Sequence, residues 1–163
     1  MDREWRHDEK SLFSVDGKLI IKGTGYHQFA PGLSLCIVKG AVMEIGNNFS
    51  CSHDAKILVF DKLIIGNDNM WSFDETILDS DAHLIFDENG NMISCNNEIT
   101  FGDRVWLGCD NIVLKGASIP TGCIVAAGST ITSCVYPKNS IITSKGKVIK
   151  ENIVWNKTLN YNG

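Results

Sequence analysis

A histidine at the end of a short acidic stretch is the residue of this chain best suited to chemistry. His83 closes the run Asp79-Ser80-Asp81-Ala82-His83. A neutral imidazole can accept a proton near neutral pH, and a neighbouring carboxylate can hold its other ring nitrogen. The run therefore contains the groups for a general base that Asp81, Asp79 or a backbone carbonyl could orient. A solvated loop histidine is the alternative.

The remaining histidines and the cysteines form no recognisable ligand set. They are His7, His27 and His53, with Cys36, Cys51, Cys95, Cys109, Cys123 and Cys134. No two cysteines have the CxxC spacing of zinc sites. A domain of this length needs no disulfides, so reduced cysteines in a cytoplasmic protein are expected, with Cys123 as a buried thiol.

The elements that must position these residues follow a period of six. Between positions 101 and 132 an apolar residue recurs at every sixth place, namely Phe101, Leu107, Val113, Ile119, Val125 and Ile131. This period fits neither an amphipathic helix nor an isolated strand. It predicts an all-β solenoid, in which three hexads form one coil of a parallel β-helix with these residues pointing inward. An ordinary sandwich would need more variable spacing.

The repeat continues toward the N-terminus in a weaker form. Ile45, Cys51, Ile57 and Leu63 are six apart, and a register shifted by two residues starts at Ile65. Trp71 lies in this second register and is expected to fill the core of a wide coil. The segment 1–36 is expected to be less regular, and 145–163 to form a C-terminal tail.

One excursion interrupts the solenoid. The ladder breaks between Ile77 and Glu98, and residues 87–91 read as a turn, so a loop is predicted at about 84–98. Ile65 and Phe101 are still a multiple of six apart, so the loop leaves the register unchanged. Because loops on a rigid scaffold carry function, a site is expected here.

Composition places the chain among ordinary globular proteins. Its 163 residues are 44% hydrophobic and 21% charged, which predicts a single domain over 1–163. A net charge of -4 argues against a nucleic-acid surface. The first ten residues are highly polar and no apolar run is long enough for a membrane span, so neither a secretory signal nor a membrane segment is expected.

The chain resembles the hexapeptide-repeat acyltransferases with a left-handed β-helix, in particular the branch of galactoside, maltose and capsule or O-antigen sugar O-acetyltransferases. The resemblance covers roughly residues 63 to 150 and includes the stretches 65–68, 79–87, 99–108, 113–116 and 125–132. Its most specific feature is an ordered pair of elements, S-D-x-H at 80–83 and V-W-[IL]-G at 105–108.

The resemblance implies a homotrimeric enzyme that moves an acetyl group from acetyl-CoA to a hydroxyl of a sugar or glycan, in cytoplasmic polysaccharide biosynthesis and without a metal. His83 is then the general base, because the sugar hydroxyl must lose its proton as it attacks the thioester. Asp81 is its candidate partner. Active sites of the family lie between subunits. Ile112 and Ile124, which have an outward phase, are expected to serve the trimer interface.

The resemblance also assigns positions along the donor. Trp106 should face outward and wall the cleft beside the acceptor and the pantetheine arm, or pack in the trimer interface. The Cys109 amide is a candidate oxyanion donor. Ala127 matches a position whose amide binds pantetheine, and Thr132 matches a hydroxyl near the nucleotide end. Lys145 is expected to meet a CoA phosphate, with a solvated basic tail as the alternative.

Three other functions stay open. An N-acetyltransferase of an amino sugar would share the fold and the donor. A metal-dependent hydratase on the same solenoid would need three histidines at one metal, and His27, His53 and His83 lack the expected spacing. A non-catalytic solenoid binding module is disfavoured by the presence of both His83 and Trp106.

Overall fold

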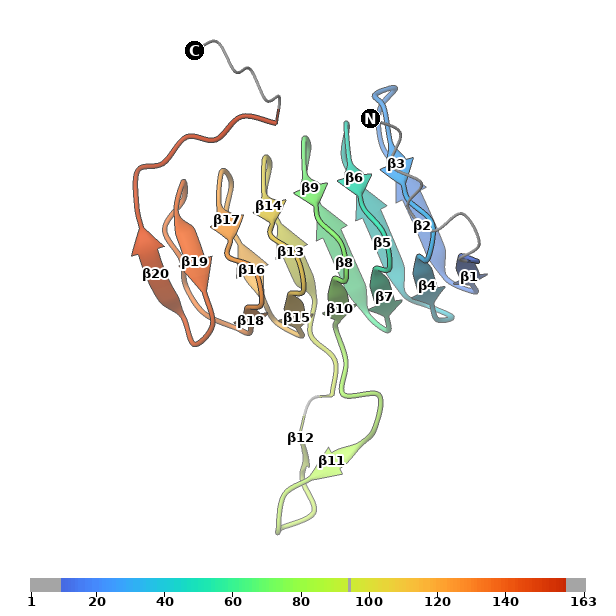
Figure 1. Cartoon of the computed structure of the whole chain (residues 1–163). Coiled ribbons are helices and arrows are strands. Elements are labelled where there is room, and N and C mark those ends of the chain that lie inside the picture. Colours follow the sequence, from blue (N-terminus) through green and yellow to red (C-terminus); the bar gives the residue numbers. More distant parts are fainter. Residues whose placement is uncertain (1–9, 94, 158–163) are drawn as a thin grey trace, which may run out of the picture.

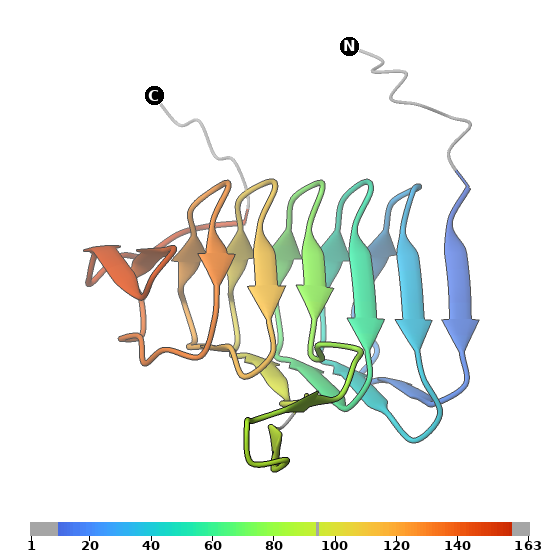
Figure 2. The same ribbon diagram turned by 90° about the horizontal axis from the view of Figure 1, so that it is seen from below.

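Three sheets wind around one apolar core and form a parallel β-helix, with the coils stacked in a single row (Figures 1 and 2). The computed structural model describes residues 10–93 and 95–157. His7 and the last part of the expected tail therefore lie outside the described residues. Each of the first five coils contributes one strand to sheet A, one to sheet B and one to sheet C in turn, and the last coil contributes strands to sheets A and C.

Neighbouring strands within each sheet belong to neighbouring coils. Sheet A contains, in spatial order, β1 (Leu12–Val15), β4 (Ser34–Ile37), β7 (Lys56–Val59), β10 (Thr76–Leu78), β15 (Ile112–Leu114) and β18 (Thr130–Ile131). Sheet B contains β16 (Ser118–Ile119), β13 (Ile99–Phe101), β8 (Lys62–Ile65), β5 (Val42–Ile45) and β2 (Lys18–Ile21). Sheet C contains β20 (Lys147–Lys150), β19 (Ile141–Thr143), β17 (Ile124–Val125), β14 (Trp106–Leu107), β9 (Met70–Trp71), β6 (Ser50–Cys51) and β3 (Gln28–Phe29).

The predicted solenoid and its inward residues are confirmed. All six residues of the hexad series from Phe101 to Ile131 are buried. Phe101 pairs with Ile119 and Leu107 with Val125, so each residue lies beside the one eighteen positions later. Three hexads therefore make one coil in this part of the chain, and the inward side chains form continuous apolar rows.

The coils nearer the N-terminus are wider. Leu63 and Ile65 are both buried, because β8 has four residues and turns two of them inward. Lys56 of β7 pairs with Thr76 of β10, twenty residues on instead of eighteen, and this longer coil explains the two-residue shift of register in the sequence. The segment before residue 36, expected to be less regular, supplies a whole coil whose β1 pairs in register with β4, twenty-two residues on. Its spacing differs from six, which is why the hexad period does not reveal it.

The corners between sheets use residues that tolerate a left-handed backbone. Asn48 and Asp68 have φ of 55° and 58° at the corner between sheets B and C. Asp54, Asp74 and Asp110 have φ of 61° to 63° at the corner between sheets C and A. Short polar side chains visit this region at lower cost than others. Equivalent corners stack, and their backbone groups hydrogen-bond from coil to coil, as from the Asp68 N–H to the Asn47 carbonyl at 2.7 Å.

The predicted excursion is confirmed as a hairpin arm, which we define as residues 79–98. It leaves the corner between sheets A and B after β10 and projects from the solenoid (Figure 1). Its strands β11 (Ile85–Phe86) and β12 (Met92–Ile93) pair antiparallel. The Asp87 carboxylate accepts hydrogen bonds from the Asn89 and Asn91 amides, which shapes the predicted turn. Ile65 still pairs with Phe101 across the insertion.

The C-terminal segment turns back on the solenoid. β19 and β20 form an antiparallel hairpin at the end of sheet C. Residues 151–157, which we call the tail, then run back over the coils toward β14 (Figure 1). The Ile153 amide donates to the Asn139 carbonyl at 2.9 Å, and the Lys157 ammonium donates to the Asn48 carbonyl at 2.8 Å. The tail thus crosses several coils.

An aromatic column occupies the wide half of the core. Phe29, Phe49, Trp71 and Phe101 follow one another with ring centroids 4.8 to 5.5 Å apart. The expectation that Trp71 packs in the core is confirmed, since its side chain is almost fully buried.

We predict that Trp71→Ala lowers the free energy of unfolding by about 3–5 kcal/mol, because it leaves a cavity between two aromatic rings. Urea denaturation followed by circular dichroism measures the change. Phe73→Ala is the matched control: this side chain is half exposed, so its loss should cost less than about 1 kcal/mol. Equal losses in the two variants would contradict the column's role in stability.

Candidate functional site

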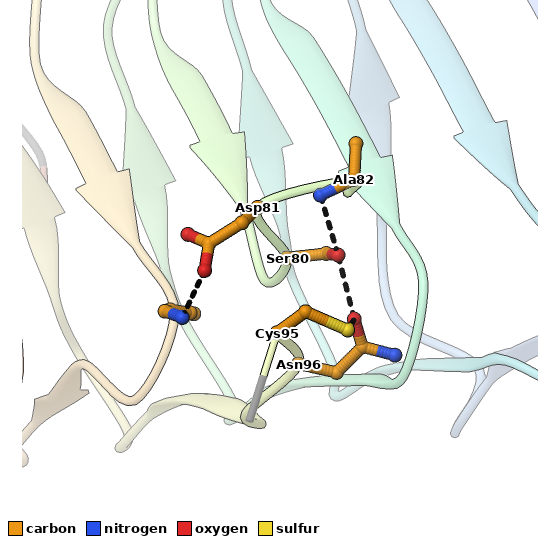
Figure 3. A network of polar contacts seen from close by, with 6 residues as sticks. Ser80, Asp81, Ala82, Cys95 and Asn96 are labelled. Carbon is orange, nitrogen blue, oxygen red and sulfur yellow. Dashed lines mark hydrogen bonds and ion pairs between the residues drawn. The ribbon is translucent and has the colours of Figure 1, made fainter. Parts of the chain in front are cut away.

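The foot of the arm is a small network of hydrogen bonds (Figure 3). The Ser80 hydroxyl donates to the Asn96 side-chain oxygen at 2.6 Å and accepts from the Ala82 amide at 2.9 Å. The Asp81 amide donates to the Cys95 carbonyl at 2.8 Å. Ala82 is held at φ 58°, an uncommon backbone for alanine. Such strain persists only where surrounding contacts enforce it, so His83 follows a tightly fixed residue.

His83 itself is exposed, and within residues 10–93 and 95–157 its ring makes no hydrogen bond. The expected pairing with an aspartate is not formed. Asp81 instead makes an ion pair with Lys115 of the next coil and points away from Ser80 in Figure 3. Asp79 is buried and accepts hydrogen bonds from the backbone amides of Phe60 and Asp61. Neither carboxylate orients His83 within one copy of the chain.

Asp79 therefore has a structural role at the base of the arm. Burial raises the pKa of its carboxyl, and the amides of Phe60 and Asp61 offset part of this effect. Its own carbonyl accepts from the Asn97 amide at 3.0 Å. Through these bonds Asp79 joins the turn between β7 and β8 to both strands of the arm's foot.

A cavity of about 480 Å³ lies beside the foot of the arm at the corner between sheets A and B. Its lining is Leu78, Ser80, Asp81, Ile85, Leu114, Lys115, Thr132 and Ser133. The structure thus brings together Asp81 and Thr132 of the predicted site residues. Lys115 supplies a cation to the same space, and the sequence offers no signal for its pairing with a residue thirty-four positions away.

Cys109 and Ala127 come together at the corner between sheets C and A. The Cys109 carbonyl accepts from the Gly128 amide at 2.9 Å, which stacks the two corners. A side chain at Gly108 would come within 2.8 Å of the Ala127 nitrogen, so only glycine permits this close approach. In the described part of the chain, neither the Cys109 nor the Ala127 amide donates a backbone hydrogen bond at its corner. Unpaired amides of this kind can receive a ligand.

Trp106 faces outward from sheet C, as its place in the hexad predicts, and is half-buried. Its indole N–H donates to the Ser72 hydroxyl at 3.4 Å, and Ser72 donates to the Leu107 carbonyl at 2.7 Å. A cavity of about 270 Å³ on the same face is lined by Gln28, Ser50, Cys51, Ser52, Met70, Trp71, Ser72 and Phe73. The Trp106 ring also packs on Trp155 of the tail, with centroids 5.9 Å apart.

The remaining predicted positions lie at the surface. Lys145 is exposed in the turn between β19 and β20, at φ 60°. Ile112 and Ile124 face outward as expected, Ile112 being 42% exposed and Ile124 half-buried. Thr132 lies at the opposite end of β18 from Ala127, so a donor that meets both would have to extend across sheet A.

The predicted catalytic groups are separated within one copy. His83 leaves the corner between sheets A and B, whereas Trp106 lies on sheet C, the sheet opposite that corner. Cys109 precedes β15, the neighbour of β10 in sheet A, and so lies at the corner between sheets C and A, whereas His83 follows β10 at the corner between sheets A and B. With three sheets around one core, these groups cannot meet across the solenoid. A site that combines them needs a second copy.

A buried carboxyl lies near the corner that carries Cys109. Glu75 is fully buried, and its oxygens meet no hydrogen-bond partner among the described residues. Burial raises the pKa of its carboxyl to about 8, and Asn111 offsets part of this effect. Glu75 is therefore mostly protonated at neutral pH, and burial of its charged form would be costly.

The titratable side chains form no metal centre in the described structure. Among residues 10–93 and 95–157, no three His, Cys, Asp or Glu side chains lie close enough to hold a metal ion together. The six cysteines are free thiols. The described part of the chain also contains no helix with the length and apolarity needed to cross a membrane.

Comparisons with known proteins identify sugar acetyltransferases as relatives. The galactoside O-acetyltransferase of Escherichia coli K12 is 29% identical over 115 residues, which are 69% of this chain and 55% of that protein. The polysialic acid O-acetyltransferase of Neisseria meningitidis is 33% identical over 100 residues, which are 60% of this chain and 46% of that protein. The chain thus spans about half the length of these relatives. No protein-family model matches it.

A solved structure has the same fold. The polySia-specific acetyltransferase NeuO matches with a TM-score of 0.75 at 22% identity, over 94% of this chain and 79% of that one. The relatives confirm the resemblance to the sugar O-acetyltransferase branch. The structural match confirms the β-helix of that class.

We predict that wild-type stability falls as pH rises from about 4.5 to about 8, because the folded chain keeps the Glu75 proton that the unfolded chain releases. The expected slope is about 1.4 kcal/mol per pH unit. Glu75→Gln should remove it and be more stable than the wild type at pH 8, as measured by urea denaturation across this range. The surface variant Glu98→Gln should keep the slope of stability against pH. If Glu98→Gln loses this slope, or if Glu75→Gln keeps it, the slope does not come from Glu75.

Proposed function

We propose that this protein is an acetyl-CoA-dependent O-acetyltransferase that moves an acetyl group to a hydroxyl of a sugar or glycan. The proposal is supported most by one observation. His83 is an exposed imidazole next to the strained Ala82 on a rigidly anchored arm, in a fold whose relatives are named for sugar O-acetylation. We assign the activity to polysaccharide biosynthesis in the cytoplasm, where acetyl-CoA is present and thiols stay reduced.

The reaction is a direct transfer. The acceptor hydroxyl oxygen attacks the thioester carbonyl carbon while His83 takes the hydroxyl proton. The tetrahedral oxyanion accepts a hydrogen bond from the Cys109 amide. The carbon–sulfur bond then breaks, the CoA sulfur takes the proton back from His83, and an acetyl ester and free CoA thiol result. No acyl-enzyme forms, so Cys109 acts through its backbone only.

The donor lies against the outer surface of sheets C and A. The unpaired amides of Cys109 and Ala127 hold the thioester carbonyl and the pantetheine arm, and Trp106 walls the cleft. Thr132 and Lys145 lie further out and meet the nucleotide end. Lys145 is a point charge suited to a phosphate. The residues present therefore fit acetyl-CoA, with backbone groups as the main contacts.

A homotrimer completes the site. His83 of one copy faces Trp106 and Cys109 of the next, because these groups lie on opposite sides of a single copy. The arm carries a row of exposed apolar side chains suited to this contact, namely Leu84, Ile85, Phe86, Met92 and Ile93. Contiguous exposed apolar patches commonly mark protein–protein interfaces. The occupant we assign to them is the neighbouring copy.

The acceptor distinguishes this function from its nearest alternative. An N-acetyltransferase would use the same fold, donor and base on an amino sugar. We favour a hydroxyl because the relatives named for their acceptor chemistry are O-acetyltransferases. A hydratase needs three metal ligands at one point, and the described histidines His27, His53 and His83 do not converge.

We predict that the protein releases free thiol from acetyl-CoA only with sugar hydroxyl acceptors, and that His83→Ala lowers kcat by about 10²- to 10⁴-fold. A screen of sugars, amino sugars and oligosaccharides with a thiol reagent measures this. His53→Gln is the matched control and should keep wild-type turnover. Near wild-type turnover in His83→Ala would refute the base. Turnover with amines alone would establish the N-acetyltransferase instead.

We also predict a trimer in solution, seen by sedimentation equilibrium as three times the mass of the chain. Replacing Leu84 and Phe86 of the arm by serine should weaken the trimer and lower activity with it, because apolar contact area is lost. Replacing the tail's exposed Val154 by serine should change neither. A stable and active monomer would refute the shared site.

A further inference from the structure

The tail places one large aromatic side chain against the outer face of sheet C. Trp155 is only 8% exposed, although it lies outside the solenoid core. Its neighbour Val154 is 90% exposed, so burial is specific to the tryptophan. The Trp155 ring packs on Trp106 with an interplanar angle of 48°. The tail therefore buries one face of the residue that walls the proposed cleft.

Trp155 is fixed by a reciprocal pair of hydrogen bonds. Its indole N–H donates to the Arg104 carbonyl at 3.0 Å, and the Arg104 guanidinium donates to the Trp155 carbonyl at 2.7 Å. The guanidinium also lies 6.0 Å from the centre of the Trp155 ring, within the range of a cation–π interaction. These contacts define both the position and the orientation of the ring.

Arg104 is an unusual residue at its corner. Its φ is 54°, whereas the equivalent corners of the two adjacent coils use Asp68 and Gly122, and the coil before them uses Asn48. A long side chain in this region costs more than asparagine, aspartate or glycine. The contacts of its guanidinium with Trp155 account for the exception. Two residues fifty-one positions apart thus depend on each other.

We infer that Trp155 is a positioning residue, which holds Trp106 in the orientation that the transfer reaction requires. The inference rests on the proposed function, in which Trp106 walls the cleft. Trp155 approaches from the corner between sheets B and C, and the Trp106 N–H points the other way, to Ser72. The open side of Trp106 therefore faces Ser72 and Phe73, and the Phe73 carbonyl accepts a hydrogen bond from the amide of Asp110, next to Cys109.

The tail is fixed against the solenoid by hydrogen bonds along its length. Lys157 donates to the carbonyls of Asn48 and Asn69, which lie four and three coils away from the Asn139 carbonyl that holds Ile153. Burial lowers the pKa of the Lys157 ammonium, so its environment is partly desolvated. A segment tied at three points along its length presents Trp155 in one place.

A double-mutant cycle between Trp106 and Trp155 tests the inference in the full-length chain. Trp155→Ala should lower kcat/KM for acetyl transfer by about tenfold to a hundredfold, because small displacements of positioning groups have effects of this size. The double variant should lose no more than Trp106→Ala alone, since both changes remove the same oriented ring. The circular-dichroism couplet of two adjacent indoles should vanish in all three variants.

Three further variants of this chain serve as controls. His83→Ala should lower turnover by about 10²- to 10⁴-fold, which tests the proposed function separately. Trp155→Phe keeps an aromatic ring and should retain the fold with an intermediate loss, and Val154→Ala should match the wild type. Kinetic constants of Trp155→Ala within twofold of the wild type, or losses that multiply in the double variant, would overturn the positioning role.

Discussion

The stacking of inward side chains from coil to coil is the interaction on which the rest of this structure depends. Each strand must return to its sheet directly beside its counterpart, or the apolar rows and the backbone hydrogen bonds are lost together. The chain meets this condition with coils of different lengths, because the inward residues Leu63 and Ile65 of a wide coil are continued in the next coil by the buried Ile99 and Phe101. The chain also keeps its strands in register across the inserted arm. A rigid scaffold can therefore carry a projecting hairpin without disturbing the coil that follows.

The same geometry separates the proposed reactive groups. A corner between two sheets is the point of the cross-section farthest from the third sheet, so His83 and Trp106 cannot approach each other in one copy. The hydrogen bonds at the foot of the arm and the ion pair of Asp81 with Lys115 hold His83 outward instead of folding it back. In the proposed trimer, assembly is part of the chemistry, because the base and the donor surface belong to different copies. The buried tail residue Trp155 packs on Trp106 within a single copy.

The sequence predicts the parts of the structure that follow the six-residue repeat, and it predicts few of the contacts outside that repeat. The period of six identifies the inward residues, the outward phase of Trp106 and the place of the arm, because each follows from counting along one chain. The wide first coils escape it because paired positions there are 20 or 22 residues apart instead of 18. The contacts of Asp81 with Lys115 and of Trp155 with Arg104 join positions 34 and 51 residues apart, and the period of six predicts neither of them. The period also gives no sign that the Asp79 carboxylate binds the amides of the turn between β7 and β8. The free amides at Cys109 and Ala127 could be expected only from the resemblance, because a backbone N–H is present in almost every residue type and its contacts cannot be inferred from the side chain.

Subunit mixing tests the central claim, that each active site combines His83 of one copy with Trp106 of another. His83→Ala and Trp106→Ala trimers should each be nearly inactive alone. After dissociation and reassembly in equal amounts, about a quarter of the sites should combine an intact histidine with an intact tryptophan, and acetyl transfer to the sugar acceptor should return to that level. Mass spectrometry of the intact assemblies verifies that mixed trimers have formed. Mixed trimers that remain as inactive as their parents would contradict the account.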